Sequence, residues 1–153
     1  MTTELSRRCH PACLVCANDR PDGLALRFEL QADGSVAAEF GCGAVFQGYP
    51  DRLHGGVVAM LLDAAMTHCL FARNVAGLTA KLSIRYRRGV MVGMPAVVRA
   101  RVVDADSPLY YLEAEIVQGE DVCAAAKGTF WDRGAGEFGR DLPPEPPDVP
   151  AVG

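Results

Sequence analysis

Apolar and polar side chains alternate over residues 24–31, which is the pattern of a β-strand with one buried face. Asp33 and Gly34 follow, a dipeptide typical of a hairpin turn. Residues 36–40 continue the apolar face on a return strand, and glycines break the pattern over residues 41–50. The first element that we predict is therefore an antiparallel hairpin.

The segment from Gly56 to about Asn74 is apolar nearly all round, although the run over residues 57–72 carries Asp63 and His68. It predicts a helix, and a helix without a polar face must be covered by protein on most sides. The apolar run over residues 57–72 is shorter than the roughly 20 residues that a membrane span needs. We therefore expect a buried helix with His68 in its core, and no membrane span.

Strand patterns with a two-residue period return over residues 78–87, 96–104, 109–117 and 122–131. The middle two predict a hairpin with a register that sets Arg99 opposite Glu115. The same register sets Arg101 opposite Glu113, so that one face carries complementary charges and the other is small and apolar. We predict an α+β fold in which a curved antiparallel sheet wraps one long helix.

The length of 153 residues corresponds to one domain. A formal net charge of -4 and an isoelectric point near 5.3 disfavour a nucleic-acid partner, because domains that bind nucleic acids typically have values above about 9. We place the domain at residues 24–131, after a loop or cap over residues 1–23. Residues 132–153 are rich in proline and predict a disordered tail.

The cysteines give information on the cellular compartment and on possible metal binding. No signal peptide precedes the cysteines, so we expect a reducing, cytoplasmic compartment without a disulfide scaffold. Cys9, His10, Cys13 and Cys16 put four soft-metal ligands in one short stretch. Structural zinc sites usually draw ligands from two separated segments, so we predict no metal and leave zinc as the alternative.

Asp63 is the only charged residue in the apolar run of the predicted helix. Burying an unpaired carboxylate is costly and usually raises its pKa. One interpretation is a carboxylate that hydrogen-bonds a neighbouring part of the chain. The other is a catalytic acid or base, because perturbed carboxylates cluster at functional sites.

His54, Gly55 and Gly56 stand where this helix begins. Free backbone N–H groups and the helix dipole attract negative charge there, and glycine lets a ligand approach the backbone closely. One interpretation is an oxyanion hole, which needs such donors. The alternative is that the two glycines only allow a tight turn from loop to helix.

Asp63 follows His54 by nine positions, which places the two on opposite sides of a helix and about 13 Å apart along its axis. One chain cannot easily bring both to one small substrate. If both serve one active site, two copies must assemble it, one helix giving its N-terminus and the other giving Asp63. The spacing thus favours a homodimer on that condition.

The segments FQGYPDRLHGGVVAMLLDAAM and TAKLSIRYRRGVMVGMP, with CLVC and PDGLALRF upstream, resemble the hot-dog-fold acyl-CoA thioesterases of the phenylacetate-pathway type. The resemblance covers roughly residues 13–131. It implies a long helix wrapped by a curved antiparallel sheet. It also implies a homodimer with a continuous sheet, often paired again into a tetramer, with active sites at the dimer interface.

By matching position, Asp63 resembles the family's general base or nucleophile, and Gly56 resembles the residue whose N–H polarises the thioester carbonyl. His54 and Gln47 match loop groups that position the thioester. Thr79 matches a strand hydroxyl that helps to hold the water or the Asp. A base and fixed oxyanion donors suffice for thioester hydrolysis, so we expect no metal and no cofactor.

Gly55 and three arginines complete the predicted substrate-binding set, namely Arg85, Arg87 and Arg88. Guanidinium groups are suited to the phosphates of CoA. Arg85 and Arg87 alternate on one strand face, so a solvated surface explains them equally well.

These observations predict an acyl-CoA thioesterase that hydrolyses its substrate to a free acid and CoA. A hydratase or dehydratase of acyl thioesters on the same fold is one alternative. A non-catalytic module that binds acyl-CoA is another, because fold alone does not establish activity.

Overall fold

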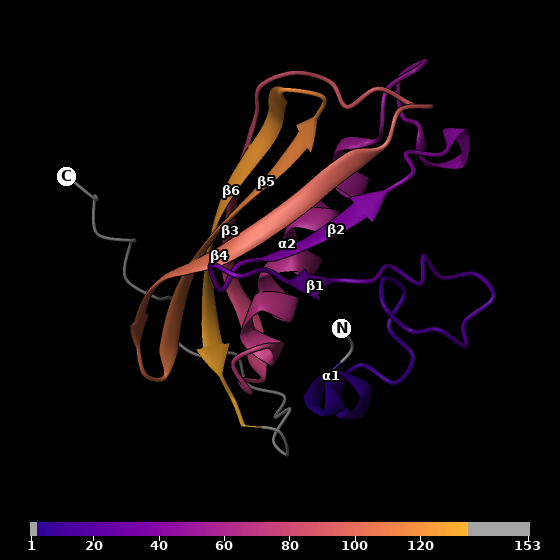
Figure 1. Ribbon diagram of the computed structural model, residues 1–153. Helices are drawn as coiled ribbons and strands as arrows, with labels where there is room; N and C mark the ends of the chain where they lie inside the picture. Colours follow the sequence, from indigo (N-terminus) through magenta and orange to yellow (C-terminus); the bar gives the residue numbers. More distant parts are fainter. Residues whose placement is uncertain (1–2, 135–153) are drawn as a thin grey trace.

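The computed structural model describes residues 3–134. Its elements are α1 (Glu4–Cys9), β1 (Glu29–Leu30), β2 (Val36–Phe40), the 3-10 helix η1 (Ala44–Phe46), α2 (Gly55–Phe71), β3 (Gly77–Tyr86), β4 (Ala96–Asp106), β5 (Leu109–Gln118) and β6 (Asp121–Asp132). The strands form one antiparallel sheet in the order β1-β2-β4-β5-β6-β3, and α2 packs against one face of it (Figure 1). The predicted architecture, a curved antiparallel sheet around one long helix, is confirmed.

Helix α2 is the centre of the core. His54 caps its N-terminus, with Nδ1 accepting the Gly56 N–H at 2.9 Å. The helix ends at Phe71, a little before the predicted limit, because Asn74 turns the chain with a φ of 60°. His68 is buried inside α2, as predicted.

Two glycines let α2 lie close to the sheet. A Cβ on Gly128 of β6 would lie 2.4 Å from Sδ of Met66, which is fully buried. A Cβ on Gly77 of β3 would lie 2.6 Å from Cδ1 of Leu70. Both distances are shorter than real Cβ contacts, so a side chain at either position would force the facing side chains of α2 to shift.

The hairpin of β4 and β5 has the predicted register over most of its length. Arg99 pairs with Glu115 and Arg101 with Glu113, and each pair forms a salt bridge. The register shifts by one residue beyond Val102, and both strands run slightly further than predicted. Cross-strand charge pairs thus located this hairpin correctly.

The first predicted hairpin is shorter in the structure. Its turn at Asp33 and Gly34 is present, with Gly34 at a φ of 82°, but β1 comprises only Glu29–Leu30, two of the residues predicted to be strand. The residues before β1 follow the N-terminal segment instead, because Ala25 has a φ of 47° and the Leu26 N–H donates to the Val15 carbonyl at 2.7 Å.

The N-terminal segment, expected to be a loop, contains the short helix α1. Leu5 of α1 packs against Phe71 and Ala76, which attaches this helix near the C-terminal end of α2. The predicted tail overlaps β6 at Asp132, and its residues 135–153 lie outside the described part of the chain. Over residues 3–134, no helix has the length and apolar character needed to cross a membrane.

Candidate active site

Asp63 of α2 is held by Thr79 of β3. The Thr79 hydroxyl Oγ1 donates to Asp63 Oδ1 at 2.5 Å. A strict two-residue alternation would put Thr79 on the same face as Lys81, away from the helix. The pairing of β3 with β6 shifts between these residues, and this bulge turns Thr79 toward α2.

The surroundings of Asp63 favour its protonated form. Burial raises the pKa of this carboxyl above its usual range, while the hydrogen bond from Thr79 and the nearby His10 lower it in part. His10 lies in the loop after α1, and nothing in the sequence pattern pointed to its proximity to Asp63. The result is a half-buried carboxyl with a raised pKa, suited to taking up a proton.

At the N-terminal end of α2, the first N–H groups are near the surface. The Gly56 N–H donates to His54 Nδ1, and the Val57 and Val58 N–H groups donate to the His54 carbonyl. Tyr86, at the end of β3, donates its hydroxyl to the Gly55 carbonyl at 2.8 Å. Sequence reasoning missed Tyr86, because its place in the strand pattern gives no sign of this long-range contact.

Gln47 belongs to the loop that leads into α2. Its Oε1 accepts the Asp51 N–H at 3.4 Å, and the His54 N–H donates to the Phe46 carbonyl at 2.8 Å. The loop is also fastened to the chain after β3, since the Leu53 N–H donates to the Val90 carbonyl at 2.9 Å. Gln47 and His54 are thus brought into one ordered loop.

Within one chain the two halves of the predicted site stay apart. Asp63 lies beside Thr79 near the beginning of β3, whereas Gly55 lies beside Tyr86 at its end. Eight residues of helix separate Gly55 from Asp63 by about 12 Å along the axis. The carboxyl and the N-terminus of α2 therefore cannot act on one carbonyl in the same chain without a large movement.

The predicted phosphate-binding arginines are also distant from Asp63. Arg85 and Arg87 line a hollow of about 1140 Å³ on the sheet face away from α2, and Asp63 is not among its lining residues. Arg88 forms a salt bridge with Asp121 at 2.8 Å. The structure therefore does not bring these arginines to Asp63 within one chain.

Residues 51–125, which include the start of α2, Asp63 and Thr79, match the family model of the Thioesterase superfamily. The chain carries a thioesterase-superfamily domain with the hot-dog fold. This confirms the resemblance to the hot-dog thioesterase family. No curated protein matches the sequence.

Solved structures of other thioesterase-fold proteins superpose on this domain. A thioesterase superfamily protein is 29% identical with a TM-score of 0.68, over 72% of this chain and only 60% of that one. The E. coli PaaI protein from the phenylacetic acid degradation operon is 19% identical, with a TM-score of 0.68 over 72% of this chain and 81% of that one. A hypothetical thioesterase protein from Streptococcus pneumoniae, solved with coenzyme A, is 19% identical, with a TM-score of 0.67 over 71% and 89%.

Proposed function

We propose that this protein hydrolyses an acyl-CoA thioester to a free carboxylic acid and CoA. The observation that carries the proposal is the environment of Asp63 on the central helix of a thioesterase-superfamily domain. Its carboxyl is half-buried, has a raised pKa and is held by Thr79 of β3. Coenzyme A in the related S. pneumoniae structure supports the choice of thiol.

In the proposed reaction, the Asp63 carboxylate removes a proton from water as the water oxygen bonds to the thioester carbonyl carbon. The carbonyl electron pair moves onto oxygen and forms an oxyanion. When the C–O double bond re-forms, the C–S bond breaks, and the CoA sulfur leaves with the proton that Asp63 had taken. Alternatively, an Asp63 oxygen itself attacks the carbon, and the C–S bond breaks to release CoA as the thiolate. Water then cleaves the resulting anhydride into the free acid and the Asp63 carboxyl group, and the proton that water loses is taken up by the thiolate.

The proposed oxyanion donor is the backbone N–H of Gly56. His54 Nδ1 accepts this N–H at 2.9 Å, so the imidazole must release it when the oxyanion forms. An oxyanion is a stronger acceptor than a neutral imidazole, which favours the exchange. Gly55, the first residue of the helix, offers a second N–H of the same orientation.

A homodimer would bring these groups to Asp63. Strand β3 is at the end of the sheet order, so its outer edge is a template for another strand. If the β3 strands of two copies pair in antiparallel fashion, the Tyr86 end of one lies beside the Thr79 end of the other. The N-terminus of one α2, attached to Tyr86, then approaches Asp63 of the partner, and each dimer has two sites.

The test of the reaction is release of free thiol from a panel of acyl-CoA substrates with short, long and aromatic acyl groups. We expect turnover with at least one class, and its loss in Asp63→Asn. Saturable binding of acyl-CoA without thiol release by the wild type would contradict the proposal and support a binding module. A mass change of the acyl group without thiol release would indicate a hydratase or dehydratase.

The test of the shared site uses two inactive variants, Asp63→Asn and Gly56→Pro, whose subunits are mixed by mild denaturation and refolding. In a mixed dimer one site has both changes and the other has neither. Random exchange makes half of the dimers mixed, so about a quarter of wild-type activity returns. Absence of recovery, with mixed dimers confirmed by mass spectrometry, would show that each chain builds its own site.

A further inference from the structure

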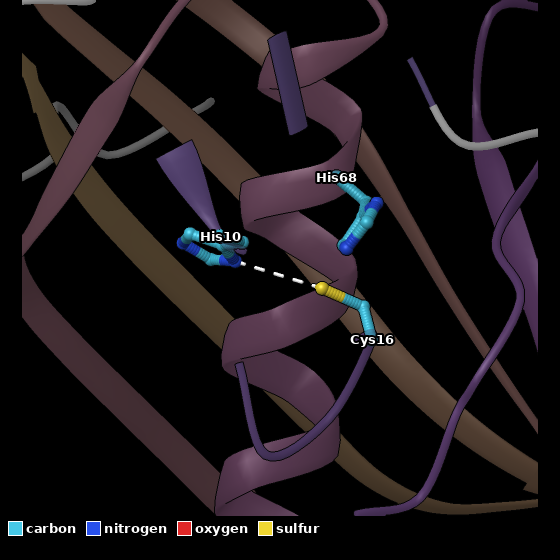
Figure 2. Close-up of side chains that lie close together, drawn as sticks. All are labelled: His10, Cys16 and His68. Atoms are coloured by element: carbon cyan, nitrogen blue, oxygen red, sulfur yellow. Dashed lines mark hydrogen bonds between the residues drawn. The ribbon is translucent and has the colours of Figure 1, made fainter. Parts of the chain in front are cut away.

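Three potential metal ligands from two distant segments meet beside α2. His10 and Cys16 come from the N-terminal segment, and His68 comes from α2 (Figure 2). One ligating atom of each lies within 4.8 Å of the others, and His10 Nδ1 is 3.7 Å from Cys16 Sγ. Two imidazoles and a thiol at these separations can close around one ion with small side-chain movements.

His68 presents an unsatisfied nitrogen to this group. The residue is only 7% exposed, and its Nε2 has no hydrogen-bond partner among the described atoms. The ring is held firmly, because Phe28 stacks on it at 4.3 Å and Phe71 meets it edge-on at 5.4 Å. A buried imidazole nitrogen without a partner is costly, and a metal ion would satisfy it.

Cys13 is the candidate fourth ligand, beyond the three residues whose ligating atoms already lie within 4.8 Å of one another. It precedes Cys16 by three residues, the C-x-x-C spacing that lets two sulfurs reach one metal. The Val15 N–H already donates to Cys13 Sγ at 3.4 Å, a contact that stabilises a thiolate. Cys9 is placed differently, since it packs at the end of α1 with the small cluster around Leu5.

We propose that His10, Cys13, Cys16 and His68 bind one Zn²⁺ ion, which fastens the N-terminal segment to α2. Two sulfur and two imidazole ligands form the tetrahedral set that zinc prefers. The sequence-based expectation of no metal considered only ligands from a single short stretch, and His68 supplies the missing second segment. The ion would lie just past Asp63 along α2, where His10 is within electrostatic range of that carboxyl.

The experiment measures metal by inductively coupled plasma mass spectrometry on untagged full-length protein. The protein is kept reduced, equilibrated with ZnCl₂ and freed of excess metal. We expect about one zinc per chain in the wild type and in the control Cys9→Ser, which changes a neighbouring thiol outside the proposed set. Cys16→Ser and His68→Asn should each lower zinc affinity by roughly 10-fold to 100-fold or more.

Reconstitution of the wild type with Co²⁺ tests the ligands without any substitution that could prevent folding. We expect intense visible bands of a tetrahedral cobalt site together with thiolate-to-cobalt charge transfer. Removal of zinc by a chelator should lower the melting temperature of the wild type by roughly 5 °C or more, and leave that of Cys16→Ser unchanged. Substoichiometric zinc with fully reduced thiols, tight zinc binding in His68→Asn, or preference for iron would each overturn the proposal.

Discussion

Two pairs of polar side chains in this molecule connect neighbouring elements, and their environments are opposite. On the outer face of the sheet, Arg101 bonds to Glu113 at 2.9 Å, with the arginine side chain 67% exposed. On the inner face, Asp63 bonds to the neutral hydroxyl of Thr79, and burial raises the pKa of the carboxyl. The outer charges are neutralised and solvated at little cost, whereas the inner carboxyl is held where ionisation is costly.

The two pairs therefore have different roles. The exposed pair supports strand register and solubility, whereas the buried pair is suited to chemistry. Alternating charges on an exposed strand stabilise by small amounts each. A single carboxyl without a strong cationic partner destabilises the folded state when ionised, and its retention in an apolar helix needs a functional reason. The predictions below test this division between the two pairs.

Asp63→Asn should have the largest effect, a loss of roughly two to four powers of ten in turnover, because a positioned general base contributes about that much. The amide oxygen can still accept the Thr79 hydroxyl, and it carries no charge to desolvate. We therefore expect the melting temperature at pH 8 to be unchanged or higher than that of the wild type. Thiol-release kinetics and calorimetry measure the two effects, and turnover within a few-fold of wild type would remove Asp63 from the mechanism.

The same variant should reveal the pH dependence of stability. The pKa of Asp63 is raised on folding, so its favourable contribution is fully present below the ordinary carboxyl pKa of about 4. That contribution is lost as the pH rises through the raised pKa. Wild-type stability relative to Asp63→Asn should thus fall as the pH rises above about 4, whereas activity should rise as the carboxylate forms. A stability difference that stays constant as the pH rises would contradict the shift.

Thr79→Val should reduce activity by roughly tenfold near neutral pH. The hydrogen bond from Thr79 lowers the pKa of Asp63, so its removal raises that pKa further and delays formation of the carboxylate. We expect the ascending limb of the kcat/KM profile to move to higher pH. Thr79→Ser keeps the hydroxyl and is the matched control; an identical displacement in Ser and Val variants would show that the methyl group, not the bond, matters.

Tyr86→Phe should have a smaller effect, about fivefold in kcat/KM, corresponding to the roughly 1 kcal/mol of one hydrogen bond. The lost bond fixes the Gly55 carbonyl and so the start of α2. Because Asp63 is untouched, the pH profile should keep its midpoint. A shifted midpoint would contradict this expectation, because it would show that the contact of Tyr86 with Gly55 affects the ionisation of Asp63.

Arg101→Ala and Glu113→Ala on the outer face should have the smallest effect. A double-mutant cycle measured by denaturant unfolding should give a coupling free energy of about 0.2–1 kcal/mol, as for other exposed pairs. Thiol release should be unchanged. A coupling free energy of several kcal/mol would mean that this face is covered in the assembled protein and is not solvated.

Local periodicity was sufficient to predict α2 and the β4–β5 hairpin. Both elements depend on contacts between residues that are close together in the sequence, so the pattern of apolar and charged residues identifies them. Asp63 could be singled out for the same reason, as the one charge in an apolar run. Alternation alone could not give the orientation of Thr79, because the bulge in β3 reverses the face that alternation assigns to it; only the family resemblance pointed to its hydroxyl. Nor could alternation predict the approach of His10 to His68, which depends on how the N-terminal segment folds back over α2.

Gly128 shows that sensitivity to mutation at this site extends beyond the residues proposed to perform chemistry. A Cβ there would lie 2.4 Å from Sδ of buried Met66, three residues after Asp63 on the same helix, so Met66 would have to shift. Gly128→Ala would thus disturb the packing of α2 near the 2.5 Å contact between Asp63 and Thr79. A residue with no functional group can thus contribute to the spacing of the reacting groups, because α2 lies against a position that carries no side chain.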